Sequence, residues 1–357
     1  MNVPVQKFLD QQIPALLRTR VFFSPFTNIY TNQALEEWLF RNAELTQPLL
    51  MLWINDPAVV TGRYQNQWIE CSPAALKKQG ILLARRNSGG GTVFHDRGNL
   101  NLTLFTSRNA YDKRSLTGFI KTILDSYGII SETGESRADI YIQGRKISGS
   151  AFKLIADRAY HHSTLLIDCD LEQLAGALHP AAREITSKGT ESIRSKTVNL
   201  REVNLEISLL SIVRRAAVLF SGEEEIGNSV EESAITVLAN QNPGIVLPDQ
   251  LESLRQRFCS DTWIHDNGPD FEQVTSPCPL THTAFAISVK KGVVQRAATS
   301  TGTTEDVKTR AVIDRIEAYL TGRRYAAAPD TYVLIESGFS MEESCQLFEW
   351  LKKEIGI

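Results

Sequence analysis

The sequence predicts an α+β protein with a larger and a smaller domain. Runs of strand-like residues are broken by helices without the regular alternation of a parallel sheet. A length of 357 residues favours two domains over one. A break at 241–248, which contains Pro243, Gly244 and Pro248, is the best boundary between them. The predicted parts are an N-terminal extension, a large domain and a small α+β domain: 1–24, 25–242 and 249–357.

The extension allows two interpretations. Lys7, Arg18 and Arg20, together with apolar residues on one helical face, fit part of a mitochondrial presequence. Pro4 and Pro14 favour a frayed terminal segment instead. Mitochondrial location is therefore one expectation for the chain, and cytoplasmic location is the other.

Composition excludes several classes of protein. Apolar residues make up 42% of the chain and charged residues 22%, as in globular proteins. The net charge of -3 disfavours bulk binding to nucleic acid or to an anionic membrane, and no apolar run has the length of a membrane span. The five cysteines are odd in number and never occur as CxxC, which argues against a disulfide scaffold and a zinc site. We expect a reduced, intracellular, metal-free protein.

Helices are predicted where apolar residues recur every three or four positions between capping and terminating residues. In the large domain these segments are 32–40, 73–79, 115–127, 170–178, 207–219 and a helix that ends at 238. Ser72 and Pro73 form the cap and the first turn of the second helix, and Gly80 ends it. Gly128 ends the third helix.

Strands are predicted from short apolar or alternating runs bounded by turn residues. In the large domain they are 49–54, 58–61, 81–84, 92–94, 100–105, 139–142, 146–155 and 160–167. Between 100 and 105, leucines alternate with Asn101 and Thr103, as in a strand. The small domain has predicted strands at 283–289 and 292–299 and predicted helices at 304–320 and 340–355.

The most unusual segment combines two arginines with three consecutive glycines, from Arg85 to Gly91. Consecutive glycines cost conformational entropy, so a fold keeps them where the backbone must go where a Cβ cannot. Their unhindered N–H groups can surround an anion, with Ser88 as a further donor and the arginines as charge. The segment leads into a strand and lacks the pattern of a P-loop or a dinucleotide fingerprint. Anion binding is favoured over the alternative, a bulge or hairpin tip.

Lys146 stands beside small residues in a predicted strand, in the order Lys146-Ile147-Ser148-Gly149-Ser150. A surface lysine is the commoner case, but the small neighbours leave room for a ligand. Lys146 is either a Schiff-base nucleophile or a fixed cation that stabilises a phosphate or an acyl oxyanion. The nearby anion-binding loop favours the fixed cation.

Other polar features are weaker. His95 and Asp96 are expected to form a solvated polar turn, and Arg137 with Asp139 an ordinary ion pair. Cys169, between two aspartates, is expected to be a buried thiol with a raised pKa. No Ser, His, Asp order indicates a catalytic triad. The residues alone thus predict a protein that holds a phosphorylated or adenylated ligand and transfers a group without a covalent intermediate.

Five ordered motifs resemble those of the lipoate–protein ligase A and lipoyltransferase family, which has the biotin/lipoyl-ligase fold. They are VVTGRYQNQW at 59–68, LARRNSGGGTVFHD at 83–96, GRKISGSA at 144–151, HHSTLL at 161–166 and KGTESIRS at 188–195. The resemblance covers most of the first 240 residues and is much weaker beyond Pro243. It implies a mixed-sheet catalytic domain with a small accessory domain.

The resemblance also implies an activity. In such enzymes the lipoyl group is carried as lipoyl-AMP, and a lysine of an acceptor lipoyl domain attacks its acyl carbon. By resemblance, Lys146 is the catalytic cation between phosphate and acyl carbonyl. The residues implied to bind the lipoyl-adenylate are Arg86, Ser88, Gly89, Gly90, Gly91, Thr92, Val93, Phe94, Arg137, Asp139, Thr164, Thr190 and Ser192. No metal ligands are implied.

The motifs leave alternatives open within this function. Thr92 is typical of animal lipoyltransferases, which need preformed lipoyl-AMP, whereas Lys188, Gly189, Arg194 and Ser195 are kept as in full ligases. Transfer from lipoyl-AMP is the first interpretation, and an ATP- and Mg-dependent lipoate–protein ligase is the second. A non-catalytic protein that binds a lipoyl group or a nucleotide is the alternative from another class. Related octanoyltransferases use a cysteine nucleophile, and residues 179–195 contain no cysteine.

The expected partners follow from the same resemblance. They are lipoyl domains of 2-oxoacid dehydrogenase complexes, the glycine-cleavage H protein, and lipoate or lipoyl-AMP as small molecules. Nucleic acid and membranes are not expected partners. The sequence does not predict acceptor preference or oligomeric state. It does not predict the choice between lipoate and octanoate either, because a methylene or a ring end in an apolar pocket changes the binding free energy by only ~1–3 kcal/mol.

Overall fold

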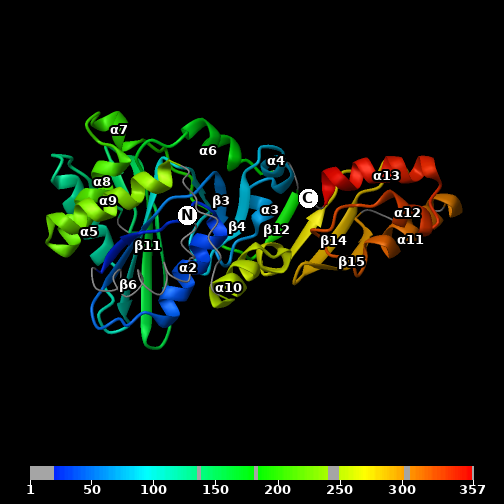
Figure 1. Cartoon of the computed structure of the whole chain (residues 1–357). Helices are drawn as coiled ribbons and strands as arrows, with labels where there is room; N and C mark the ends of the chain where they lie inside the picture. Colours follow the sequence, from blue (N-terminus) through cyan, green and yellow to red (C-terminus); the bar gives the residue numbers. More distant parts are fainter. Residues whose placement is uncertain (1–19, 135–137, 181–183, 240–248, 301–305, 356–357) are drawn as a thin grey trace. The chain divides into compact units, whose positions relative to one another are not determined.

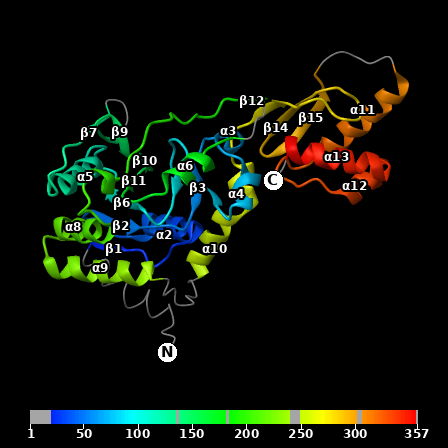
Figure 2. The same ribbon diagram turned by 90° about the horizontal axis from the view of Figure 1, so that it is seen from above.

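A computed structural model describes residues 20–134, 138–180, 184–239, 249–300 and 306–355 (Figures 1 and 2). The chain forms two compact units. The first unit contains residues 1–62, 84–176 and 193–259, and the second contains 63–83, 177–192 and 260–357. Within the described ranges no helix has both the length and the apolar character needed to cross a membrane.

A five-stranded mixed sheet organises the first unit. Its strand order is β1-β2-β6-β11-β10, with bounds Val21–Phe23, Leu49–Trp53, Asn99–Ser107, Arg158–Leu166 and Ser150–Leu154. β1 runs parallel to β2, and the remaining neighbours are antiparallel. The mixed-sheet α+β class predicted from the sequence is therefore confirmed.

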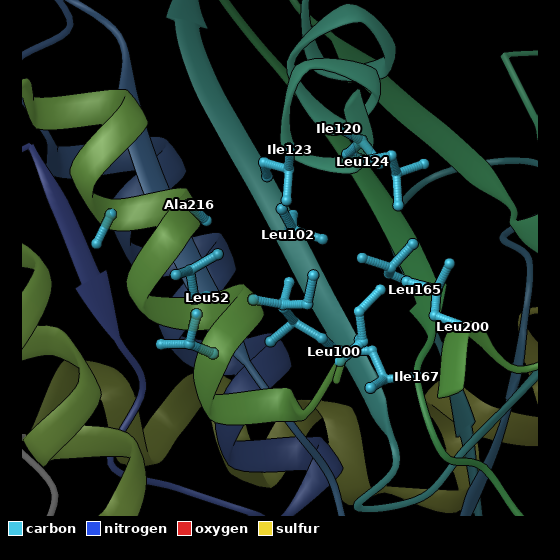
Figure 3. Close-up of a cluster of buried hydrophobic side chains, with 14 of the residues drawn as sticks. Leu52, Leu100, Leu102, Ile120, Ile123, Leu124, Leu165, Ile167, Leu200 and Ala216 are labelled. Atoms are coloured by element: carbon cyan, nitrogen blue, oxygen red, sulfur yellow. The ribbon is translucent and has the colours of Figure 1, made fainter. Parts of the chain in front are cut away.

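One face of this sheet is the hydrophobic core of the first unit. Alternate residues of a strand point to the same face, so Leu100, Leu102 and Leu104 of β6 lie together on it. Apolar residues of three helices cover them: α5 (Ser115–Asp125), α8 (Leu209–Ser221) and α9 (Glu224–Leu238). Figure 3 shows Leu102 between the α5 residues and Leu100. The periodic apolar stripes that predict these helices thus mark the surfaces that they bury.

The opposite face is buried as well and carries both polar and apolar side chains. Asn101 and Thr103 of β6 are almost fully buried, under α2 (Ile29–Asn42). The ring of Phe40 packs edge-on against Tyr160 of β11, with centroids 5.0 Å apart. In both overall views α2 lies on the side of the sheet away from α8 and α9 (Figures 1 and 2). The two faces therefore differ in chemistry, although both exclude water.

Two small sheets complete the first unit. One has the order β4-β3-β5, with bounds Leu82–Arg85, Ala58–Thr61 and Val93–His95; the other has the order β7-β8-β9, with bounds Glu132–Thr133, Ile140–Ile142 and Arg145–Ser148. The glycine loop connects β4 to β5, as predicted, and Lys146 lies in β9. Helices α7 (Leu200–Val203) and α10 (Asp249–Cys259) also belong to this unit, and α6 (Leu171–Ala177) ends at its boundary.

The second unit is built on an antiparallel sheet of order β12-β13-β14-β15, with bounds Glu184–Ser187, Phe271–Val274, Phe285–Lys290 and Val293–Thr299. Its helical elements are α3 (Gln67–Glu70), α4 (Pro73–Lys78), a π-helix (Thr262–Asp266), α11 (Val307–Leu320), α12 (Thr331–Glu336) and α13 (Met341–Glu354). Trp68 is buried in its core among residues that include Phe285 and Tyr325.

The predicted parts differ from the two units in several places: residues 63–83 and 177–192, predicted in the large domain, belong to the second unit, and two ends differ as well. Residues 21–23 are predicted to belong to the N-terminal extension, but all three are buried in β1, which pairs with β2. Residues 249–259 are predicted to begin the small domain, but they form α10 of the first unit, where the Trp38 indole donates to Gln250. Residues 1–19 and 240–248 lie outside the described residues, so the nature of the extension stays a prediction.

Replacing Leu102 by alanine should lower the free energy of unfolding by about 2–5 kcal/mol, because it leaves a cavity in a fully buried cluster. Urea unfolding of the full chain measures the change. Leu205→Ala is the matched control, since Leu205 is 84% exposed. Equal losses in the two variants would show that the sheet face is not the core.

Candidate active site

The guanidinium of Arg86 holds the glycine loop from inside the protein. Its Nε atom donates to Ser88 Oγ at 3.0 Å and to the Gly89 carbonyl at 3.1 Å. Nη2 donates to the Gly89 and Gly91 carbonyls at 2.6 Å each, and Nη1 donates to the Val60 carbonyl at 3.0 Å. Arg86 is buried, so its direct partners are groups of the loop and of β3 rather than solvent. Its first role in the structure is to fix the path of the loop.

This clamp also orients the peptide groups of the loop. In a trans peptide the C=O and the following N–H point in opposite directions. Because the carbonyls of Gly89 and Gly91 point at Arg86, the N–H groups of Gly90 and Thr92 point away from it. Successive backbone N–H groups of a loop are donors of the kind that bind anions.

Gly62 and Gly90 bring the loop against β3 without room for side chains. A Cβ on Gly62 would lie 2.1 Å from the Gly90 carbonyl oxygen. Gly90 has φ +88, a conformation that favours glycine, and a Cβ there would lie 3.0 Å from Arg86 Nη2. The alternative of a bulge without specific packing is therefore disfavoured.

The other predicted residues of this segment lie at its two ends. Ser88 Oγ lies 2.8 Å from Nε2 of His162 on β11. Val93 and Phe94 are in β5 and pair with β3, and Phe94 is buried. Thr92, which is also buried, connects the glycines to this strand.

Lys146 is held by a carboxylate. Its Nζ lies 2.7 Å from Asp139 Oδ2, and the other Asp139 oxygen accepts the Ser150 N–H at 3.2 Å. A Cβ on Gly149 would lie 3.1 Å from Lys146 Nζ and 3.7 Å from Thr164 Oγ1, so glycine leaves the ammonium its space. The structure thus brings Lys146, Asp139 and Thr164 together, as the motifs imply.

The lysine cluster and the glycine loop are neighbours. A Cβ on Gly90 would lie 3.4 Å from Ala151 Cβ and 3.9 Å from the Ser150 carbonyl oxygen. Ser150 is the residue whose N–H binds Asp139. The glycine loop therefore packs against the strand residues that adjoin the ion pair of Lys146 and Asp139.

Thr190 and Ser192 lie in the second unit, where they are anchored to the segment 64–70. The Thr190 N–H donates to the Tyr64 carbonyl at 3.1 Å. The Ser192 N–H donates to Glu70 Oε1 at 3.0 Å, and Gln65 Nε2 donates to Ser192 Oγ at 3.0 Å. Two of the sequence motifs thus fold together. Arg137 lies outside the described residues.

His95 and Asp96 are buried, so the prediction of a solvated polar turn is wrong. Asn55 Nδ2 lies 2.8 Å from His95 Nδ1, and Asp96 accepts the Gly98 and Asp170 N–H groups. Burial, with the charges of Arg86 and His162 as smaller causes, lowers the pKa of His95 to about 3. His95 is therefore a neutral core residue at neutral pH.

Cys169 is buried, as predicted. Burial, followed by the charge of Asp96, raises the pKa of its thiol far above the usual range. Within the described ranges, no group of three or more His, Cys, Asp or Glu side chains is arranged to hold a metal ion.

A family model described as the lipoyl protein ligase A/B catalytic domain matches residues 28–220. This match covers more than half of the chain and includes the glycine loop and Lys146. The chain belongs to the lipoyl protein ligase A/B family. It is an enzyme of the class that attaches lipoate to proteins, as the sequence motifs predict.

Two curated relatives support the assignment of this ligase. A lipoate-protein ligase A of Bdellovibrio bacteriovorus is 34% identical over 262 residues, which are 71% of the ligase and 74% of the relative. A lipoate-protein ligase A of Psychrobacter cryohalolentis is 38% identical over 192 residues, which are 54% and 56% of the two chains. Both relatives are bacterial, so they give no support to a mitochondrial location.

Solved structures of lipoate ligases have a fold similar to that of this chain. The ligase resembles LipL1 of P. falciparum in complex with lipoate, with a TM-score of 0.54, 22% identity and coverage of 94% and 99% of the two chains. It also resembles a lipoate-protein ligase A bound with ATP, with a TM-score of 0.50, 22% identity and coverage of 68% and 96%. These similarities confirm the predicted fold class.

Two residues that sequence reasoning missed contribute to the ligase site. Glu36 and Glu37 of α2 are buried and bind the residues at the start of the glycine loop, directly or through His162. The adjacent acids in an otherwise amphipathic helix look like a solvated pair. Only their positions between Leu35 and Leu39, both buried, hinted that the two carboxylates lie inside.

The stability of the ligase should fall in acid partly because of His95. Below pH 6.5 the unfolded chain takes up a proton on this imidazole, whereas the folded chain does so only near pH 3. Stability is therefore lost as pH falls through this window, by at most about 1.4 kcal/mol per pH unit, and is fully present above it. Urea unfolding at pH 7 and pH 5 should show about 2 kcal/mol less pH dependence in His95→Asn than in the natural chain. Identical pH dependence would contradict the buried neutral histidine.

Proposed function

We propose that the ligase transfers a lipoyl group from lipoyl-AMP to a lysine of a lipoyl domain. The observation that carries this proposal is the Lys146 ammonium, ion-paired to an Asp139 that also binds Ser150, the residue against which the glycine loop packs. The loop is suited to the phosphate and the ammonium to the bond between phosphate and acyl group. Lipoyl domains of 2-oxoacid dehydrogenase complexes and the glycine-cleavage H protein are the proposed acceptors.

The proposed reaction needs no covalent enzyme intermediate. The amine of the acceptor lysine attacks the acyl carbon, and the bond between that carbon and the AMP phosphate oxygen breaks. AMP leaves with the electron pair, and the amine gives up its proton to solvent. Lys146 stabilises the negative charge on the carbonyl oxygen and on the departing phosphate, which is greatest in the transition state. Asp139 keeps the ammonium in position for both.

A second candidate is a full ligase that also makes lipoyl-AMP from lipoate and ATP with Mg²⁺. The names of the curated relatives favour it, and so do Lys188, Gly189, Arg194 and Ser195. The lipoate-protein ligase A bound with ATP is also similar in fold. Thr190 and Ser192 stay predicted nucleotide-binding residues in either case.

The intact mass of an apo lipoyl domain distinguishes the candidates. The acceptor is incubated with the ligase and either lipoate plus Mg-ATP or synthetic lipoyl-AMP. A lipoyl mass gain in both reactions shows a full ligase, and a gain with lipoyl-AMP alone shows a transferase. No gain in either reaction contradicts the proposal and leaves the non-catalytic binding protein. The same mass measurement on the apo H protein tests the second class of acceptor.

A further inference from the structure

Helix α2 places two adjacent carboxylates in the interior. Glu36 and Glu37 are 4% and 3% exposed. A buried carboxylate is costly unless cations and hydrogen-bond donors surround it. The partners of both residues are therefore informative, and both sets lead to the start of the glycine loop.

Glu37 binds the loop directly. Its Oε2 accepts a hydrogen bond from Asn87 Nδ2 at 2.7 Å and lies 2.8 Å from Lys153 Nζ on β10. Its Oε1 lies 2.6 Å from Arg41 Nη2, one turn further along α2. Asn87 immediately precedes Ser88, so this carboxylate ties the start of the loop to the helix and to β10.

Glu36 reaches the loop through His162. Glu36 Oε1 lies 2.8 Å from His162 Nδ1 and also accepts the Thr103 hydroxyl at 2.8 Å. The other imidazole nitrogen, Nε2, lies 2.8 Å from Ser88 Oγ. Trp53 Nε1 donates to Thr103 Oγ1 at 3.0 Å, which leaves the Thr103 hydrogen for Glu36.

The donors fix the direction of this chain of hydrogen bonds. The Glu36 carboxylate can only accept, so the ring proton of a neutral His162 is on Nδ1, and Nε2 accepts the hydrogen of Ser88 while Ser88 Oγ accepts from Arg86 Nε. Each group has one consistent role, so the chain holds Ser88 in a single orientation.

The order serine, histidine, glutamate is also that of a hydrolytic triad, but the surroundings disagree with a nucleophile. Ser88 is 1% exposed, and its oxygen already accepts from the Arg86 guanidinium. A nucleophilic oxygen needs access to substrate, and a hydrogen bond from a cation lowers its nucleophilicity. We propose instead that Glu36 and Glu37 are positioning residues, which set the place of the glycine loop through Ser88 and Asn87. This inference rests on the proposed function of that loop.

The test exchanges donor and acceptor between positions 37 and 87. Asn87→Asp places a second carboxylate against Glu37, so the loop should shift and the Kd for lipoyl-AMP should rise about tenfold. Adding Glu37→Gln restores a donor and an acceptor in reversed order, and the Kd should return to within about threefold of the natural chain. Calorimetry with lipoyl-AMP measures each Kd without requiring turnover.

Glu36→Gln tests the second route and should also raise the Kd about tenfold, with little change in the KM for the lipoyl domain. Glu44→Gln is the matched control, because Glu44 is an exposed glutamate just beyond α2. Asn87→Ala replaces Asn87→Asp if the latter does not fold, and it too should weaken binding. If Glu36 and Glu37 only stabilised the fold, the variants would have a lower Tm, and adding Glu37→Gln to Asn87→Asp would not restore the Kd for lipoyl-AMP.

Three results would overturn the inference. They are an unchanged Kd in Asn87→Asp and Glu36→Gln, a double variant as weak as Asn87→Asp, and covalent labelling of Ser88 by a fluorophosphonate probe. Failure of the proposed function would give a different experimental result. In that case the natural chain gives no lipoyl mass gain on the lipoyl domain, while the Kd comparison among variants still stands.

Discussion

Lys146→Ala is expected to slow lipoyl transfer from lipoyl-AMP by at least about a hundredfold, because it removes the cation that is proposed to stabilise the charge on the acyl oxygen and the leaving phosphate. The contribution of such a fixed cation is largest in the transition state. Binding of lipoyl-AMP should weaken less than the rate falls. Single-turnover transfer, followed by the intact mass of the lipoyl domain, separates the rate from the affinity.

Two further variants make the Lys146 experiment specific. Lys78→Ala removes an exposed lysine at the end of α4 and should leave transfer unchanged. The double variant Lys146→Met with Asp139→Asn removes the ion pair without leaving a buried carboxylate unpaired. It should fold as well as the natural chain and still transfer slowly. Transfer at the natural rate in either Lys146 variant would contradict the proposed role.

Gly62→Ala is expected to reduce transfer by about a hundredfold or more, although Gly62 is not predicted to touch substrate. The added methyl would lie 2.1 Å from the Gly90 carbonyl oxygen, a distance that no packing tolerates, so the loop must move. A displacement near 1 Å at a positioned group can cost about a hundredfold in rate. The measurement is kcat/KM for lipoyl-AMP, together with urea unfolding.

Gly118→Ala is the matched control for Gly62. A Cβ on Gly118 meets nothing within 4 Å, and the residue lies inside α5, where alanine is the better helix former. Its activity should be unchanged, and its stability should be equal or slightly higher. An active Gly62→Ala variant would show that the loop and β3 are not in close contact.

The sequence predicts most of the first unit because its patterns are local. The leucines of β6 and the stripes of α5 and α8 each predict both an element and its buried side. The glycine loop is recognisable because three consecutive glycines beside two arginines are uncommon without a ligand, and Lys146 is recognisable from its small neighbours and the motif around it. The structure adds that the Arg86 guanidinium is buried and donates to the carbonyls of the loop.

The features that the sequence does not predict depend on contacts between distant segments. β12 lies in a polar stretch and becomes a strand because β13, about 85 residues later, pairs with it. Trp68 joins the core of the second unit for the same reason. His95 looks like a turn residue until the burial of its ring is known. Glu36 and Glu37 have partners 50 to 126 residues away, which no periodic pattern encodes.

The chemically distinct faces of the large sheet have a consequence for genetic variation. On β6, odd and even positions serve different purposes: Leu100, Leu102 and Leu104 hold the core, whereas Asn101 and Thr103 lie under α2. In a library that covers this strand, changes at the even positions should lower the amount of protein in the cell. Among the odd positions, changes at Thr103 should also lower lipoylation, because its hydroxyl donates to Glu36, which binds the His162 that contacts Ser88. A comparison of protein amount with activity per molecule would then separate Thr103 from the leucines beside it.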